Sequence, residues 1–139
     1  MRPIVATIEK IQSVESLNVV TFLAHESWLM MVSLELGEKI TVGRRVVLSC
    51  KPTSVALAKT DILEERMQHM LSYANQIAVT ITSIDKGRLL SSVRLRFGEA
   101  VLEALLITER FESMGLEVGD EAVALIKVSD LSILEVLDD

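Results

Sequence analysis

The chain has 139 residues and a net charge of −6, and half of its residues are hydrophobic although only 4% are aromatic. The negative charge argues against nucleic-acid binding, which needs a basic surface to displace the counterions of phosphate. Because aromatic residues are so few, we expect a core built from Val, Ile, Leu, Ala and Met. No apolar run approaches the roughly 18 residues of a membrane span, so membrane insertion is not expected. The first residues have no signal-peptide features, which predicts a cytoplasmic protein.

The first part of the chain contains five segments with the composition of β-strands. They cover residues 4–14, 19–24, 28–33, 45–51 and 55–58. Only residues 34–39 lie between the third strand and the turn at Gly43, so a helix there is at most short. The single cysteine, Cys50, cannot form a disulfide within the chain, and we interpret it as a small strand residue. We place a first, degenerate domain at residues 1–59.

Residues 60–71 are polar and charged and contain neither Gly nor Pro. This composition predicts a short helical linker between two domains, with Asp61 near the start of the helix. The two histidines, His25 and His69, have no partners at metal-ligand spacing. We interpret both as surface or linker residues.

The second part, residues 72–139, has the clearer pattern. Apolar and polar residues alternate over 77–83, a hairpin turn is expected at 85–88, and strands follow at 89–97 and 100–107. Thr108 is a plausible N-cap of a short helix that ends at Gly115. Two further strands are expected at 121–128 and 131–137. Three strands, a short helix and two strands form the order of an OB-type barrel. The sequence therefore predicts a mainly β protein with two tandem five-stranded OB-like barrels, each with at most one short helix.

An internal repeat links the two parts. Residues 43–55 return as residues 119–131, and each copy has a Gly, an apolar strand, a Lys and a hydroxyl two residues later. The pairs are Lys51 with Thr53 and Lys127 with Ser129. Because side chains alternate across a strand, each Lys and its hydroxyl are expected on one face. A cation beside a hydroxyl suggests a small oxyanion ligand, held locally because the chain as a whole is negative.

The second part also resembles a known family. The string SYANQIAVTITSIDKG, the Ile-Thr before the expected helix, the Gly-Leu-x-x-Gly turn and the Ile-Lys-x-Ser strand together resemble a transport-associated OB domain of the molbindin type. The resemblance covers residues 72–136, and a weaker one is carried by residues 43–58. Tandem copies resemble the two-domain molbindins. That resemblance implies a cytoplasmic protein that binds molybdate or tungstate and assembles as a homotrimer.

The resemblance also implies which residues hold the oxyanion. In the second domain they are Ser72, Asn75, Thr108, Lys127, Val128 and Ser129, and in the first domain Ser33, Lys51, Pro52 and Thr53. Two positions depart from the family. Its arginine in the opening Ser-Ala-Arg-Asn motif falls on Ala74, and Phe111 stands where a second hydroxyl is usual. We therefore expect fewer or altered sites.

The expected chemistry is binding without turnover. Molybdate and tungstate are unprotonated dianions at neutral pH, so N–H groups, hydroxyls and lysine can satisfy their oxygens without any acceptor. The sequence has no Ser-His-Asp set, no glycine-rich phosphate loop and no paired carboxylates. We expect no enzymatic activity, no organic cofactor and no metal cation bound directly by side chains.

Several interpretations stay open. Lys51 and Lys127 are either oxyanion ligands or ordinary surface residues, and Thr108 is either a helix cap, a ligand or both. The chain is either a protein of molybdenum or tungsten homeostasis, with a molybdate transporter or cofactor-synthesis proteins as partners, or a ligand-poor regulatory or assembly module. The module would act with a molybdate transporter or a transcription regulator. Ala74, Phe111 and the degenerate first repeat favour the module.

Overall fold

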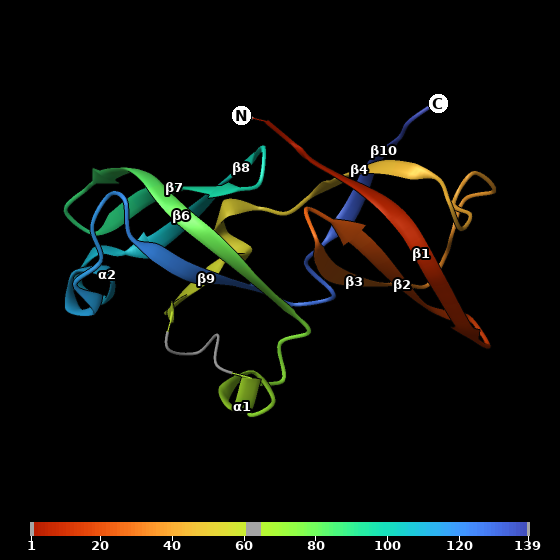
Figure 1. Ribbon diagram of the computed structural model, residues 1–139, viewed down its shortest axis with the longest axis horizontal. Coiled ribbons are helices and arrows are strands. Elements are labelled where there is room, and N and C mark those ends of the chain that lie inside the picture. Colours follow the sequence, from red (N-terminus) through yellow and green to blue (C-terminus); the bar gives the residue numbers. More distant parts are fainter. Residues whose placement is uncertain (1, 61–64, 139) are drawn as a thin grey trace.

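The computed structural model describes residues 2–60 and 65–138, which form two curled five-stranded sheets side by side (Figure 1). The first sheet has the order β10-β4-β1-β2-β3 and the second the order β5-β9-β6-β7-β8. The strands of the first sheet are β1 Ile4–Val14, β2 Leu17–Ala24, β3 Ser27–Ser33, β4 Arg45–Ser49 and β10 Ser132–Val136. Those of the second are β5 Ala56–Lys59, β6 Asn75–Lys86, β7 Leu90–Phe97, β8 Ala100–Ile107 and β9 Glu121–Ile126. The expected mainly β architecture is confirmed.

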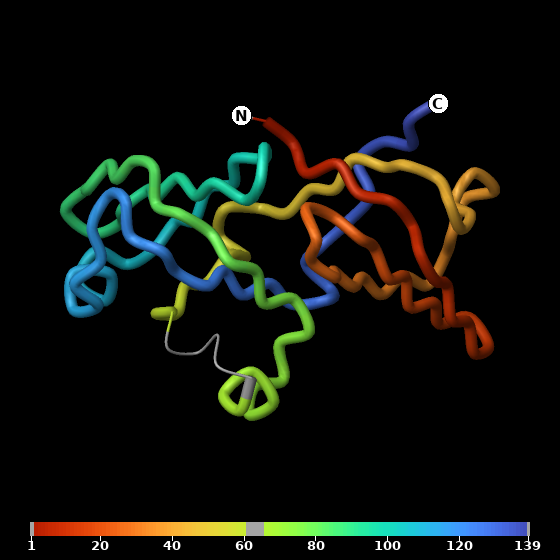
Figure 2. Tube along the Cα trace, viewed as in Figure 1, coloured from red at the N-terminus to blue at the C-terminus, as the bar shows by residue number. Residues whose placement is uncertain are grey.

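Each sheet takes its last strand from the other half of the chain. β5 follows β4 in sequence but pairs antiparallel with β9, so that Ala56 lies opposite Leu125. β10 follows β9 but pairs with β4, so that Ser132 lies opposite Ser49. Figure 2 shows the two connections crossing between the sheets in opposite directions. Neither half of the chain therefore completes a sheet by itself.

This exchange corrects the simple tandem arrangement expected from the sequence. The strand expected at 55–58 exists as β5, and the strand expected at 131–137 exists as β10, but each belongs to the opposite sheet. The division into 1–59 and 72–139 therefore does not coincide with sheet membership at these two strands. Apolar alternation indicates that a segment is a strand and not which strand it pairs with. Since the halves are similar in sequence, the pattern of the last strand does not indicate which sheet it joins.

The repeat is visible in the backbone at the start of β4 and β9. The Gly43 N–H donates to the Ile8 carbonyl at 2.7 Å, and the Gly119 N–H donates to the Ile81 carbonyl at 2.8 Å. The two glycines have φ angles of 93° and 95°, which other residues rarely adopt. The pairing register shifts directly after Ile8 in β1 and directly after Ile81 in β6. The two halves thus share a bulge and the glycine turn that packs on it.

The remaining elements are short. They are the 3-10 turn η1 Pro52–Ser54 and the helices α1 Glu65–Gln68 and α2 Thr108–Met114. A helix in the linker is confirmed, although Asp61 lies outside the described residues. Gly115 ends α2 with φ 67°, as expected. Thr108 is not the N-cap, because α2 begins at Thr108 and Ile107 occupies the cap position without a side-chain hydrogen bond.

Most strands differ from expectation by one or two residues at an end, and β4 ends at Ser49 and not at residue 51. β6 continues through Lys86, so the hairpin turn expected at 85–88 begins later, and β9 ends at Ile126. Residues 34–44 contain turns and no helix. Among the described residues, no helix is long and apolar enough to cross a membrane.

The core is aliphatic, as the composition predicts. Its buried residues alternate along β1 and β6, where Ile4, Ile8, Ile77 and Ile81 are at most 1% exposed. Phe22, Phe97 and Phe111 are the buried aromatic residues among those described. Every second residue of these strands faces inward, which is the pattern that filling a small curled sheet requires.

One edge strand of each sheet is hydrogen-bonded to the other half of the chain. Unpaired edge strands expose backbone groups that favour aggregation, so their coverage is important. On the edge strand β3, the Val32 N–H donates to the Val128 carbonyl at 3.1 Å. On the edge strand β8, the Val101 N–H donates to the Arg2 carbonyl at 2.9 Å. These contacts hold the two sheets together and position the turn after β9.

Candidate functional site

A small cavity lies where the start of β6 meets the end of β9. Its volume is about 190 Å³, and its lining residues are Ser72, Tyr73, Lys127, Val128 and Ser129. Because Asn75 lies opposite Ile126 in the β6–β9 pair, the residues just before β6 and just after β9 must be neighbours. The structure therefore brings together four of the residues expected to bind an oxyanion. We call this space the Lys127 cavity.

A turn, and not strand alternation, places Lys127 and Ser129 together. β9 has ended at Ile126, and the Asp130 N–H donates to the Lys127 carbonyl at 3.0 Å. The Val128 carbonyl is held by the Val32 N–H of β3, so the turn is tied to the first sheet. The expected proximity of the lysine and the hydroxyl is present, but for a different physical reason from the one the sequence suggested.

The Lys127 cavity has the donors that an oxyanion requires. Its polar side chains are one ammonium, two serine hydroxyls and one phenol, and no carboxylate lines it. All four groups can donate hydrogen bonds to an anion, and the ammonium adds charge. Four water-sized oxygens need about 120 Å³ at about 30 Å³ each. A tetrahedral oxyanion therefore fits the cavity in both size and chemistry.

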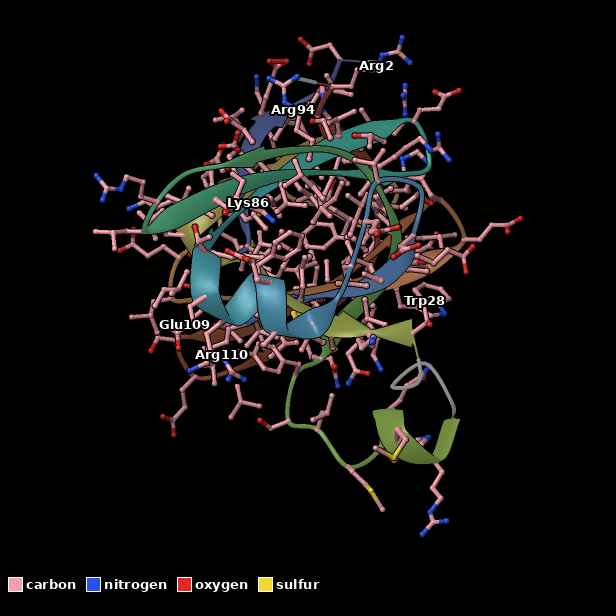
Figure 3. The ribbon with its side chains drawn as sticks, turned by 90° about the vertical axis from the view of Figure 1, so that its left-hand side faces the viewer. Arg2, Trp28, Lys86, Arg94, Glu109 and Arg110 are labelled. Carbon is pink, nitrogen blue, oxygen red and sulfur yellow. The ribbon has the colours of Figure 1, made fainter. Side chains whose placement is uncertain are left out.

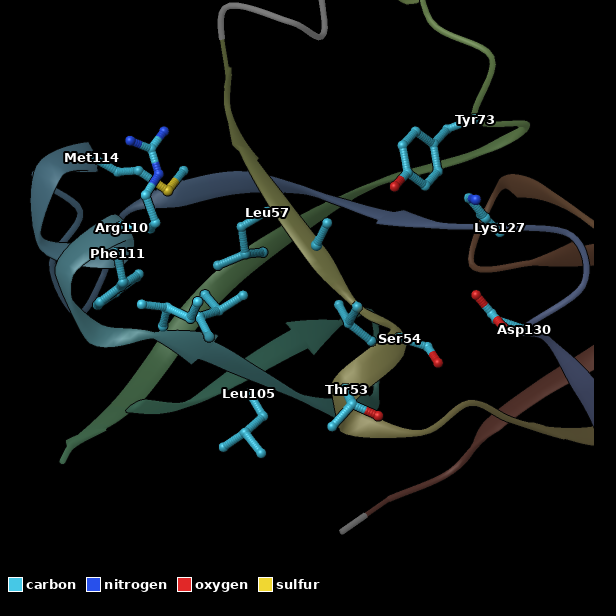
Figure 4. Close-up of a pocket in the computed structure, with 14 residues that line it drawn as sticks. Thr53, Ser54, Leu57, Tyr73, Leu105, Arg110, Phe111, Met114, Lys127 and Asp130 are labelled. Carbon is cyan, nitrogen blue, oxygen red and sulfur yellow. The ribbon is translucent and has the colours of Figure 1, made fainter. Parts of the chain in front are cut away.

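A larger groove of about 560 Å³ continues from this cavity and shares Tyr73 and Lys127 with it (Figure 4). Thr53 from η1 and Asp130 lie at the same polar end. The other end, between β5, β8 and α2, is apolar except for Arg110. Because β5 is exchanged, Thr53 of the first repeat lies in the groove with Lys127 of the second. The two repeats thus contribute to one continuous surface.

Asp130 makes the groove less suitable for an anion than the Lys127 cavity. Burial raises the pKa of the Cys50 thiol, and the negative charge of Asp130 raises it further. The charge of Asp130 therefore acts on the part of the fold that contains Cys50. A dianion in the groove would meet the same charge.

Asn75 does not lie in the Lys127 cavity with its expected partners. Its side chain is fully buried, its Nδ2 donates to the Met30 carbonyl at 2.9 Å, and its Oδ1 accepts from the Met30 N–H at 2.7 Å. Both ends of the amide are therefore occupied by the open edge of β3. The structure gives Asn75 the role of joining β6 to the first sheet.

Thr108 is also occupied within the chain. Its hydroxyl donates to the Gly87 carbonyl at 2.9 Å and accepts from the Ser91 hydroxyl at 2.8 Å. It is 5% exposed and does not line the Lys127 cavity. The side chain anchors the β6–β7 turn against the start of α2. Its neighbour Glu109 is exposed at the periphery of the molecule (Figure 3).

The expected residues of the first repeat are dispersed. The Ser33 hydroxyl donates a hydrogen bond to the backbone carbonyl of Glu35 at 2.6 Å. It lines a second groove of about 590 Å³ between β3 and β10, which also includes Ser129. Lys51 and Pro52 line neither groove, nor the Lys127 cavity. Among these three spaces, the repeated Lys and hydroxyl line one together only in the second copy.

Ala74 faces a different space from its neighbour Tyr73. It lines a cavity of about 390 Å³ together with Trp28 and His69, among others. An arginine at this position in the same chain would start from that cavity and not from the Lys127 cavity. Sequence reasoning missed Tyr73, although it stands between two residues of the opening motif and is the only tyrosine in the chain.

The described residues contain no group of three or more His, Cys, Asp or Glu side chains that could hold a metal ion. The Lys127 cavity suits an anion and not a cation, because its ammonium repels positive charge and no carboxylate lines it. The arrangement can therefore bind a small oxyanion through charge-assisted hydrogen bonds.

Comparisons with known proteins agree with this fold and locate the resemblance. Residues 71–133 match the model of the TOBE domain. The structure is similar to a crystal structure of the cytoplasmic molybdate-binding protein ModG with molybdate bound. The TM-score is 0.81 at 24% sequence identity, over 94% of this chain and 92% of that chain. A search of curated proteins by sequence found no match. Residues 71–133 are therefore similar to the TOBE domain, and the chain has a fold similar to that of ModG.

Proposed function

We propose that this protein binds molybdate or tungstate in the cytoplasm and serves molybdenum or tungsten homeostasis by buffering, storing or delivering the anion. The observation that carries the proposal is the Lys127 cavity, in which Ser72, Lys127 and Ser129 combine donors without a carboxylate. The TOBE match covers both segments that build the cavity. The likeness to a cytoplasmic molybdate-binding protein supports the same ligand and location.

The donor set favours an unprotonated dianion. Molybdate and tungstate present only acceptors at neutral pH, so lysine, hydroxyls and backbone N–H groups can serve every oxygen. Hydrogen phosphate carries a proton and therefore favours a site with a strong acceptor, such as a carboxylate. The Lys127 cavity has hydroxyl oxygens but no carboxylate to take that role. We therefore propose binding of molybdate or tungstate in preference to phosphate, and binding in place of catalysis.

Self-association completes the proposal. Lys127 is the only cation among the five residues that line the cavity, and taking a dianion out of water with incomplete partners is costly. Donors from a second copy of the chain would complete the shell. Large apolar side chains are exposed at Ile107, Val118 and Leu134, each at least 59% exposed, and a closed assembly would cover such residues. We propose a homotrimer, in keeping with the resemblance to two-domain molbindins.

Calorimetric titration tests the ligand. Molybdate and tungstate should bind with measurable heat, while phosphate at the same concentrations should bind much more weakly. Sulfate, a smaller unprotonated dianion, is the control for anion size. Bound anion should also raise the unfolding temperature by mass action. Absence of heat and of any thermal shift with both metal oxyanions would refute the proposed ligand.

Light scattering tests the assembly. A trimer should give a mass near three times 15.4 kDa, with and without bound anion. A monomer that binds molybdate tightly would contradict the proposed role of self-association. It would leave the ligand assignment in place.

A second function is favoured by a specific observation. The side chains of Asn75 and Thr108 form hydrogen bonds within the chain. Fewer groups are therefore left to bind an oxyanion than the family resemblance implies. Such a protein would act as a regulatory or assembly module through a molybdate transporter or a transcription regulator. Elemental analysis of the purified protein distinguishes the two. Stoichiometric molybdenum or tungsten supports the binding protein, whereas absence of metal together with co-purification of a transporter subunit or regulator supports the module.

A further inference from the structure

Tyr73 occupies a special position in the structure. Tyr73 and Lys127 are the two residues that line both the Lys127 cavity and the adjacent groove. Tyr73 is half-buried, and its carbonyl accepts a hydrogen bond from the Gln76 side chain at 2.7 Å. Gln76 also donates to the Gln68 carbonyl at 3.1 Å, so this amide ties the segment before β6 to the end of α1. The phenol is therefore presented from an anchored backbone.

The phenol lies beside Lys127 at the polar end of the groove, opposite the wall formed by Thr53 and Ser54 (Figure 4). Its hydroxyl makes no hydrogen bond to any other residue that the structure describes. Tyrosine hydroxyls are donors that commonly bind a polar group or water. A donor that shares a cavity with a lysine and has no partner among the described residues can serve an anion.

We propose that Tyr73 is a ligand-binding residue of this site, whose phenol O–H donates a hydrogen bond to the oxyanion held by Lys127. This inference rests on the proposed function. Ala74 stands at the position where the family has a cation, but it lines the separate cavity that contains Trp28 and His69. The segment before β6 therefore gives the Lys127 cavity a donor through Tyr73 and none through Ala74. It is neutral, so it contributes direction to binding more than charge.

The first test is removal of the hydroxyl alone. Tyr73→Phe keeps the ring and its packing, and should weaken molybdate binding by roughly three-fold to ten-fold, as expected for one hydrogen bond. Trp28→Phe is the matched aromatic control. Trp28 lines the separate cavity that contains His69 and Ala74, and it does not line the Lys127 cavity. This variant should therefore bind molybdate with the affinity of the unmodified protein.

The second test reads Tyr73 directly. The chain has one tyrosine and one tryptophan, so in the Trp28→Phe protein the tyrosine emission reports Tyr73 alone. Molybdate should change this emission in a saturable titration whose dissociation constant agrees with calorimetry. Phosphate at the same concentrations should leave the emission unchanged.

The outcomes separate the two proposals. If the unmodified protein binds neither molybdate nor tungstate, the proposed function fails and Tyr73 loses its role with it. If the unmodified protein binds and Tyr73→Phe binds equally well, the role of Tyr73 is wrong while the function stands. Weaker binding without any response of the tyrosine emission also overturns the role, because it indicates an indirect structural effect. Weaker binding together with a saturable emission change supports it.

Discussion

The turn after β4 and the turn after β9 share a backbone hydrogen bond but have different surroundings. The Ser54 N–H donates to the Lys51 carbonyl at 2.8 Å, and the Asp130 N–H donates to the Lys127 carbonyl at 3.0 Å. Lys127 nevertheless shares a cavity with Ser72 and Tyr73, whereas Lys51 lines neither that cavity nor the two grooves. A repeated sequence thus reproduces a local turn. Whether the turn becomes a binding site depends on the segment that packs beside it.

The strand exchange adds to this difference. It carries Thr53, the hydroxyl of the first repeat, into the groove that contains Lys127. It likewise carries Ser129 to the border of the groove between β3 and β10. Residues of the two repeats therefore combine across the sheets, and the two lysines are left in unequal environments. Four substitutions test this comparison.

The largest effect should come from Asn75→Ala. The change removes two hydrogen bonds to the Met30 backbone from a fully buried position, and each unsatisfied group costs about 1 to 3 kcal/mol. We expect the free energy of unfolding to fall by about 2 to 4 kcal/mol, measured by urea denaturation. Ser33→Ala, whose exposed hydrogen bonds are local, is the control and should change it far less. Equal effects would contradict the role of Asn75 in joining the sheets.

The second effect separates the two lysines. Lys127→Ala should weaken molybdate binding by roughly ten-fold, at the lower end of the range for a charged hydrogen bond because the side chain is exposed. Lys51→Ala, the equivalent change in the first repeat, should leave the calorimetric dissociation constant within about two-fold. Equal losses would mean that both repeats bind the anion. No loss in either variant would make both lysines ordinary surface residues.

The third effect is on molybdate affinity and comes from Asp130, an acidic residue that the first repeat lacks. Asp130 corresponds to Ser54, and Asp130→Asn removes a negative charge from the groove beside Lys127. Molybdate binding should tighten by a factor of about 1.5 to 5, in the range of an exposed charge pair. The gain should shrink at high salt. Weaker binding would indicate that Asp130 orders the turn instead of repelling the anion.

The same variant has an independent readout at Cys50. The charge of Asp130 raises the pKa of the Cys50 thiol beyond the effect of burial, so its removal should lower that pKa and increase the thiolate fraction at a given alkaline pH. Alkylation of Cys50 should then be faster in Asp130→Asn than in the unmodified protein. An unchanged rate across the alkaline range would show that the charge does not act on this part of the fold.

The smallest effect is expected for Ala74→Arg. The resemblance to molbindins suggests that a forked cation here tightens binding, but position 74 lines the cavity of Trp28 and His69. Within one chain, the calorimetric affinity for molybdate should therefore change by no more than about two-fold. Clear tightening would show that the opening segment of another copy completes the site. Light scattering on the same sample would identify that assembly.

Much of the local structure followed from the sequence. The alternation along β6 and β7 predicted strands, because one face of each must pack on the core. Gly43 and Gly119 predicted equivalent turns, and both adopt the positive φ that glycine allows. The TOBE match at residues 71–133 confirms the resemblance in the second half. These properties depend on a few neighbouring residues, so a single sequence is enough to indicate them.

Only the tertiary structure decided which strands pair and which polar groups remain available. The exchange of β5 and β10 depends on contacts between residues far apart in sequence, and similar halves give no local signal to distinguish the two pairings. Asn75 and Thr108 have the residue types of oxyanion ligands, yet their partners Met30 and Gly87 occupy them. Tyr73 gained a place beside Lys127 because β6 pairs with β9. Hydrogen-bonding capacity is a property of the side chain, whereas its use is settled by long-range packing.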